Sequence, residues 1–153
     1  MFSKRIIHGV LGGLVGGLFF GAMMAKMGML PMIGKMIGQP SVGAGFMLHM
    51  VNSAIIGAGF AVVFHRFSTR ITRGLRYGLL YGGFWWLLGP LTLMPLFMGM
   101  GLGVNWNAAA AAAMFPSLIG HLVYGAVLGI TYSWLQAREL YHRRLATATV
   151  TKG

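Results

Sequence analysis

Long runs of apolar residues alternate along this chain with short segments that carry most of its cations. Four runs are long enough to cross about 30 Å of hydrocarbon, which takes about 20 helical residues. They cover residues 6–25, 42–64, 77–98 and 114–134. No run has the wide polar face of a soluble helix or the period-two alternation of a barrel strand. The pattern predicts an all-α integral membrane protein with four transmembrane helices.

Composition agrees with a single membrane domain over residues 1–153. The chain is 57% apolar and 8% charged, with a mean hydropathy of +0.74, whereas soluble domains carry about 25% charged residues. Glu139 is its one acidic residue, and it has no cysteine. Paired-carboxylate catalysis and thiol chemistry are therefore excluded. We expect a protein that is not an enzyme.

The positive charges predict the orientation. Twelve Lys and Arg residues concentrate before the first span, in a basic loop at 66–76 and in a basic tail at 136–153, whereas the other two connections hold only Lys26 and Lys35. The positive-inside rule places both termini and the basic loop in the cytoplasm, beside anionic lipids. No basic helix is set out for a nucleic-acid groove, so we expect no nucleic-acid partner. The first span is long for a signal peptide, and we expect it to be retained.

The spans resemble each other in pairs, which predicts a tandem parallel repeat of a two-helix unit, with repeat 1 at about 5–65 and repeat 2 at about 73–135. Residues 49–57 and 121–129 share His, Val, Ala and Gly at equal spacing. Upstream, Arg5 aligns with Arg73 and Gly21 with Gly89. In this alignment, the glycines of the first span are equivalent to Tyr77, Tyr81, Trp85 and Gly89 of the third.

Glycines at steps of four leave helix faces without side chains, and such faces are typical of close helix packing. We expect packing at Gly9, Gly13, Gly17, Gly21, Gly45, Gly57, Gly125 and Gly129. The occupant of a face is either another span, a second copy in a homo-oligomer, another membrane subunit, or a flat ligand that lies against Trp85. In the third span, Gly89-Pro90 and Pro95 predict a kink or an unwound turn.

His49 and His121 are ionisable groups inside predicted spans and are therefore candidate functional residues. We expect each ring to find a hydrogen-bond partner within the bundle, with no bound metal or cofactor. Two alternatives stay open. The pair provides axial ligands for haem b, or it binds Cu(I) together with the thioethers of Met47, Met50, Met94 and Met98.

Several short segments resemble small uncharacterised four-span membrane proteins of bacteria and archaea. They are Met27–Met32, Leu48-His49, Gly82–Trp86, Leu93–Leu96 and Pro116–Gly125, and the resemblance covers about residues 9–135. It implies a multi-pass protein of the prokaryotic cytoplasmic (inner) membrane and carries no particular activity. We expect a non-enzymatic accessory or scaffold subunit that acts by helix association. The alternatives are a haem- or copper-binding protein that uses His49 and His121, and a small permease or channel.

Overall fold

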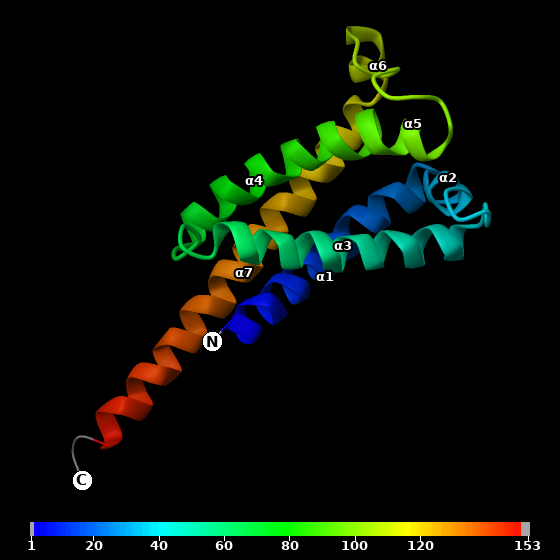
Figure 1. Ribbon diagram of the computed structural model, residues 1–153. Coiled ribbons are helices and arrows are strands. Elements are labelled where there is room, and N and C mark those ends of the chain that lie inside the picture. The colour runs from blue at the N-terminus through cyan, green and yellow to red at the C-terminus, as the bar shows by residue number, and fades with distance from the viewer. Residues whose placement is uncertain (1, 151–153) are drawn as a thin grey trace.

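The computed structural model describes residues 2–150, and all of the regular structure in that range is helical (Figure 1). The elements in chain order are α1 (Phe2–Lys26), α2 (Leu30–Lys35), α3 (Val42–Phe64), α4 (Ile71–Leu88), the π-helix η1 (Gly89–Leu93), α5 (Met94–Phe97), α6 (Ala108–Ala113) and α7 (Phe115–Val150).

Four helical segments in the described range are long and apolar enough to cross a membrane. They are Ser3–Lys26, Val42–Phe64, Ile71–Phe97 and Phe115–Arg144. The prediction of an all-helical chain with four candidate spans is confirmed, and the limits of the second agree with those read from the sequence. By length and apolarity this is the architecture of a multi-pass membrane protein.

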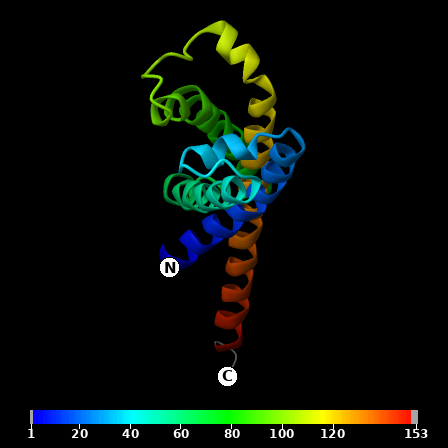
Figure 2. The same ribbon diagram turned by 90° about the vertical axis from the view of Figure 1, so that its right-hand side faces the viewer.

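In two basic segments the helices extend beyond the apolar runs. The basic segment at 66–76 is a loop only as far as Arg70, because α4 begins at Ile71 and includes Arg73 and Arg76. The tail predicted from residue 136 is helical as far as Val150, since this stretch has neither the glycine nor the proline that would end a helix. With 36 residues, α7 is about 54 Å long at 1.5 Å per residue. It extends well past the start of α1 (Figure 2).

The four spans form two antiparallel hairpins that meet through α1 and α7. Helix α1 packs along α3, and α4 packs along α7. The hairpins join where α1 also packs on α7, whereas α3 and α4 touch little. From their short connection, α3 and α4 diverge towards α2 and α5 (Figure 1). The bundle is therefore open between α3 and α4 at that end.

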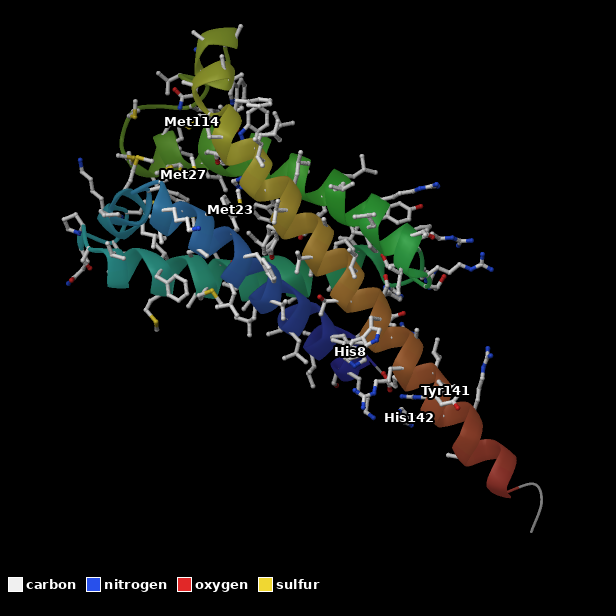
Figure 3. The ribbon with its side chains drawn as sticks, turned by 180° about the vertical axis from the view of Figure 1, so that it is seen from behind. His8, Met23, Met27, Met114, Tyr141 and His142 are labelled. Atoms are coloured by element: carbon white, nitrogen blue, oxygen red, sulfur yellow. The ribbon has the colours of Figure 1, made fainter. Side chains whose placement is uncertain are left out.

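The two ends of the bundle differ in composition. The end that carries α2, α5 and α6, here called the methionine end, holds Met23, Met27 and Met114 (Figure 3). The opposite end, here called the basic end, holds His8 and the charged part of α7. Every methionine after Met1 lies in the half of its helix, or in a connection, that is nearer the methionine end.

The predicted glycine face of α1 is filled by α3 of the same chain. A side-chain carbon on Gly9 would lie 2.7 Å from the Cβ of Ala61, and one on Gly13 would lie 2.9 Å from the Cα of Gly57. Native Cβ atoms do not approach other atoms this closely. Only hydrogen fits at these positions, which lets the two backbones touch. The first glycine face is thus an internal seam.

The outer glycines of this hairpin are also in contact. A carbon on Gly21 would lie 2.9 Å from the ring of Phe46, and one on Gly17 would lie 2.6 Å from the hydroxyl of Ser53. Gly45 instead faces α2, since a carbon there would overlap the backbone of Leu30. Glycine therefore fixes the position of the short helix as well.

The second hairpin uses Gly74, Gly78 and Gly82 of α4 against Gly125 and Gly129 of α7. A carbon on Gly78 would lie 2.9 Å from the carbonyl carbon of Gly125, and one on Gly74 would lie 3.0 Å from that of Gly129. The close packing predicted at Gly125 and Gly129 is thus present. The sequence analysis did not identify their partners in α4.

These contacts show which residues of the third span lie on its packing face. Gly57 faces Gly9 and Gly13, and Gly129 faces Gly74 and Gly78. The face of α4 that packs on α7 is therefore lined by glycines and not by the rings of Tyr77, Tyr81 and Trp85. The ring stripe of α4 lies on another side of the helix, where Tyr81 packs on the core and Trp85 lines a cavity.

A second glycine pair on α1 explains why this helix is central. A carbon on Gly12 would lie 3.0 Å from the side chain of Leu128, and one on Gly16 would lie 2.7 Å from the carbonyl oxygen of Tyr124. Both partners belong to α7. Helix α1 therefore presents small residues to α3 on one side and to α7 on another.

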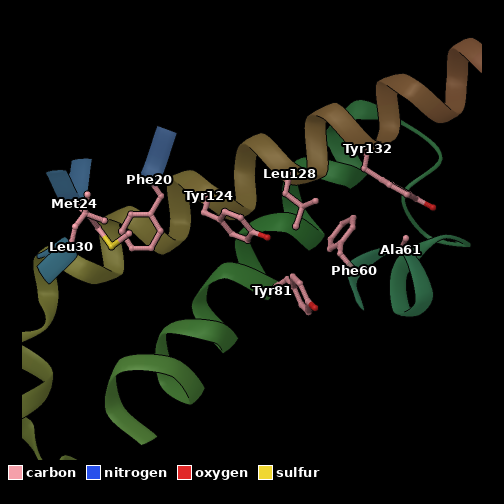
Figure 4. Packing of buried hydrophobic residues seen from close by; sticks show 9 residues of the cluster. All are labelled: Phe20, Met24, Leu30, Phe60, Ala61, Tyr81, Tyr124, Leu128 and Tyr132. Carbon is pink, nitrogen blue, oxygen red and sulfur yellow. The ribbon is translucent and has the colours of Figure 1, made fainter. Parts of the chain in front are cut away.

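The core between the helices is built largely from aromatic rings. Its buried members are Phe20, Met24, Leu30, Phe60, Ala61, Tyr81, Tyr124, Leu128 and Tyr132 (Figure 4). The hydroxyl of Tyr81 donates to the carbonyl of Ile56 at 2.9 Å, and that of Tyr124 donates to the carbonyl of Ser53 at 2.8 Å. These bonds tie α4 and α7 to α3 and satisfy hydroxyls that are expensive to bury alone.

Candidate functional site

The opening between α3 and α4 contains an apolar cavity of about 330 Å³. Its walls come from α1, α2, α3, the α4–α5 kink and α7, so every candidate span contributes. The lining side chains central to its chemistry are Phe20, His49, Trp85, Met94, Ser117 and His121. The volume falls in the range of about 300–1,000 Å³ that is usual for small-molecule sites.

The cavity exists because the third span bends. Pro90 and Pro95 lack the N–H that an α-helix needs, and the chain adopts the wider π-helical turn η1 between them. The hydroxyl of Thr92 donates to the carbonyl of Leu87 at 2.8 Å, which satisfies an acceptor beside the disturbed turn. The predicted kink is present, and its form is a π-helix.

His121 is a polar group that lines the cavity, as do Asn52 and Trp85, whose buried indole Nε1 has no hydrogen-bond partner within residues 2–150. Its Nδ1–H donates to the carbonyl of Ser117, one turn earlier in α7, at 2.8 Å. In this tautomer Nε2 carries a lone pair, and within residues 2–150 no hydrogen bond reaches it. A carbon on Gly89 would lie 3.8 Å from Nε2, so that atom faces the π-helical turn. His121 thus offers one free acceptor to an apolar space.

His49 has a different role. Its side chain is 8% exposed, and its Nε2–H donates to the carbonyl of Gly17 at 2.9 Å. Because Gly17 belongs to α1, this bond joins α1 to α3. Each imidazole thus has a hydrogen-bond partner within the bundle; that of His49 lies on another helix, whereas that of His121 lies within its own helix.

The ring of Phe20 packs against both imidazoles. Its centroid lies 5.4 Å from that of His49 and 4.7 Å from that of His121, with edge-to-face geometry in each case. The two histidines therefore share one apolar wall. Axial ligation of haem needs a free lone pair on one nitrogen of each ring. The Nε2 atom of His49 carries a proton, which it donates to the carbonyl of Gly17, so the two Nε2 atoms do not form such a pair in this arrangement.

The residues of the alternative Cu(I) site are only partly brought together. Met94 lines the cavity with both histidines, but Met47 is 66% exposed on α3. The sulfur of Met50 faces the glycine seam, 3.4 Å from where a Gly17 Cβ would lie, and Met98 is not among the lining residues. Over residues 2–150, no three His, Asp or Glu side chains lie close enough together to hold a metal ion.

Trp85 reaches the cavity as expected for a ligand-facing ring. It crosses Tyr81 edge to face, with centroids 6.1 Å apart. The neighbouring Trp86 points elsewhere, and its indole N–H donates to the carbonyl of Met114 at 3.1 Å. That bond anchors the third span to the start of α7 just beyond the cavity.

Other parts of the lining were not predicted as site residues. They include Phe20, Met24, Met29, Met32, Ile33, Met36, Asn52 and Met114. The excess of methionine towards one end was the available signal, because flexible thioethers are typical of irregular packing and adaptable binding surfaces. The wall provided by α2 requires the turn at Gly28, whose φ of +67° favours glycine.

The four candidate spans fit a multi-pass membrane protein by length and apolarity, and the apolar cavity lies among them. No family model, curated protein sequence or solved structure matches the chain.

Proposed function

We propose that this chain is a non-enzymatic protein of the prokaryotic cytoplasmic membrane that binds an apolar, hydroxyl-bearing molecule taken from the bilayer. The observation that carries the proposal is the free Nε2 acceptor of His121 in a cavity that is otherwise almost entirely apolar. Long-chain alcohols, sterol-like lipids and hydroquinones share the required chemistry.

The rim of the cavity supports entry from the lipid. Ile55 of α3 and Phe97 of α5 line it, yet they are 64% and 66% exposed. Both belong to segments long and apolar enough to cross a membrane, so their exposed surface faces hydrocarbon. A ligand dissolved in the bilayer would reach His121 between α3 and α4 without crossing water.

The hydroxyl requirement comes from the cost of an unsatisfied acceptor. A buried polar atom without a partner costs about 1–3 kcal/mol, and a hydrogen bond to it is favourable by about 1 kcal/mol net. An acyl chain would fill the cavity but leave Nε2 unpaired. A ligand with an O–H group would fill the cavity and donate to Nε2.

Topology and the repeat belong to the same proposal. We place the basic end in the cytoplasm, since the cations cluster there. We also treat the hairpins as two copies of one unit, because Gly9, Gly13 and Gly57 meet in the same register as Gly74, Gly78 and Gly129. Association through the α1 glycine face no longer supports a scaffold role, since α3 of the same chain occupies that face.

The experiment uses quenching of Trp85 by brominated ligands. Protein in detergent is titrated with a brominated long-chain alcohol and with the matching brominated alkane. We expect saturable quenching that is absent in Trp85→Phe, and about tenfold tighter binding of the alcohol, which corresponds to one hydrogen bond. His121→Phe should remove this preference, whereas the control His142→Phe at the basic end should keep it.

Two results would contradict the proposal. One is equal affinity for the alcohol and the alkane in the unmodified protein. The other is quenching that persists in Trp85→Phe, since the ligand would then bind outside the cavity.

A further inference from the structure

A second concave site lies at the basic end, on the far side of the bundle from the apolar cavity. It has a volume of about 430 Å³ and forms where the start of α1 meets the connection between α3 and α4 and residues 136–143 of α7. Its polar walls are Arg5, His65, Arg66, Thr69, Gln136 and Glu139, with Arg143 and Leu140 beside them.

The charge of this site is unbalanced in favour of cations. Glu139 accepts from Nε of Arg143 at 3.0 Å and lies 3.7 Å from Nζ of Lys4. The sequence has no other Asp or Glu. Within residues 2–150, Arg5 and Arg66 therefore form no ion pair, and both line the pocket.

The walls are held in place by hydrogen bonds across the segments. The hydroxyl of Ser133 in α7 donates to the carbonyl of Ser68 at 3.1 Å, and both serines are fully buried. This bond fastens the α3–α4 connection, which carries Arg66 and Thr69, onto α7. The amide of Gln136 also donates to the hydroxyl of Tyr132. Arg66 and Thr69 are therefore presented from a fixed segment.

Phosphate is the anion that fits these donors. Guanidinium groups bind phosphate oxygens through paired N–H bonds, and basic pockets between membrane helices are typical sites for lipid headgroups. His65 uses its Nδ1–H on the carbonyl of Val62 at 3.1 Å, so the hydroxyl of Thr69 is the donor that the pocket adds to the two arginines. Leu140 is 50% exposed at the rim, which suits an adjoining acyl chain.

We propose that this pocket binds the phosphate group of an anionic phosphoester, with Arg5 and Arg66 as its principal ligands. Two sources carry this chemistry: a phospholipid headgroup in the bilayer and a soluble phosphate compound. The proposal does not depend on occupation of the apolar cavity.

The test measures binding to protein purified in detergent and stripped of lipid. The probes are short-chain phosphatidylglycerol, the diacylglycerol of equal chain length and inorganic phosphate, each followed by the shift in melting temperature. We expect phosphatidylglycerol to stabilise the protein saturably and the diacylglycerol to have little effect. Arg5→Gln and Arg66→Gln should each weaken that binding about tenfold, as expected for a lost charge-assisted pair.

The matched control is Arg73→Gln, which removes the same charge from an exposed position of α4 outside the pocket. It should bind as the unmodified protein does, and Arg66→Lys should bind better than Arg66→Gln even if the latter folds poorly. Stabilisation by inorganic phosphate but not by phosphatidylglycerol assigns the site to soluble phosphoesters. Equal losses in Arg73→Gln and Arg66→Gln, or equal stabilisation by the diacylglycerol, would overturn the proposal.

Discussion

The glycine seam between α4 and α7 provides a quantitative test of the packing, because α4 contains a matched pair of glycines. A carbon on Gly78 would lie 2.9 Å from the carbonyl carbon of Gly125 and 3.2 Å from the Cα of Gly129, and it would overlap the oxygen of Gly125. A carbon on Gly83 of the same helix would meet nothing within 4 Å. Alanine at the two positions therefore differs only in what the new methyl group meets.

The expected magnitudes follow from two opposing effects. In a helix interior, replacing glycine by alanine is favourable by about 0.8–1.0 kcal/mol. Gly83→Ala should gain up to that amount. Gly78→Ala has the same gain, but its methyl group meets backbone, which cannot turn aside as a side chain can. Overpacking costs about 1–3 kcal/mol and occasionally more. We expect a clash with backbone to cost an amount near the upper end of that range. We expect a net loss of about 2 kcal/mol for Gly78→Ala.

The assay is unfolding of detergent-solubilised protein in increasing denaturant, followed by helical circular dichroism. The two alanine variants should differ by about 3 kcal/mol in unfolding free energy, with Gly83→Ala the more stable. A second pair tests the same reasoning in α3, where Gly45 meets the backbone of Leu30 and Gly43 meets nothing within 4 Å. If Gly78→Ala is as stable as Gly83→Ala, the backbones of α4 and α7 do not touch at Gly78, and the described packing of these two helices is contradicted.

Two further predictions concern the histidines and the topology. His49→Ala should lower the unfolding free energy by about 1–3 kcal/mol, since it removes the buried hydrogen bond that joins α3 to the carbonyl of Gly17 in α1. His121→Ala should cost less because its bond lies within one helix; equal losses in the same unfolding assay would refute this division of roles. Reporter fusions at Gly38 and Gly103 should read outside and a fusion at Arg70 inside, and any other alternation would disprove the proposed orientation.

Local chemistry explains how much of the fold was predictable. A span is identified by its apolar length, and 42–64 was placed correctly because Ser41 caps it, accepting from the backbone N–H of Ala44 at 3.2 Å. The end of α7 lies beyond the apolar run 114–134, because apolarity alone does not determine where a helix ends. A helix that leaves the apolar layer stays a helix until glycine, proline or its own propensity ends it.

The candidate site was predictable only in its chemical components. His49 and His121 were identified as ionisable groups inside predicted spans, Trp85 as a ring for a flat ligand, and Met94 as a thioether of the Cu(I) alternative. The structure places all four on one cavity. Their division of roles was not visible in the sequence, since the two histidines have similar surroundings along the chain. The difference comes from the carbonyl that each ring reaches, and that depends on which helix lies alongside.

By itself, the sequence determined what each segment is: four apolar helices, a proline-broken third span, a methionine-rich end and a basic end. These properties depend on composition and near-neighbour spacing. Only the tertiary structure decided which glycines meet. Along α4, the face with glycines and the face with rings are only a few residues apart, and the sequence does not indicate which of them packs on a neighbour. In the structure, Gly74, Gly78 and Gly82 touch the backbone of α7, which identifies the glycine face as the packing face. The same close packing joins α1 to both α3 and α7 and leaves α3 and α4 apart, and that separation creates the cavity.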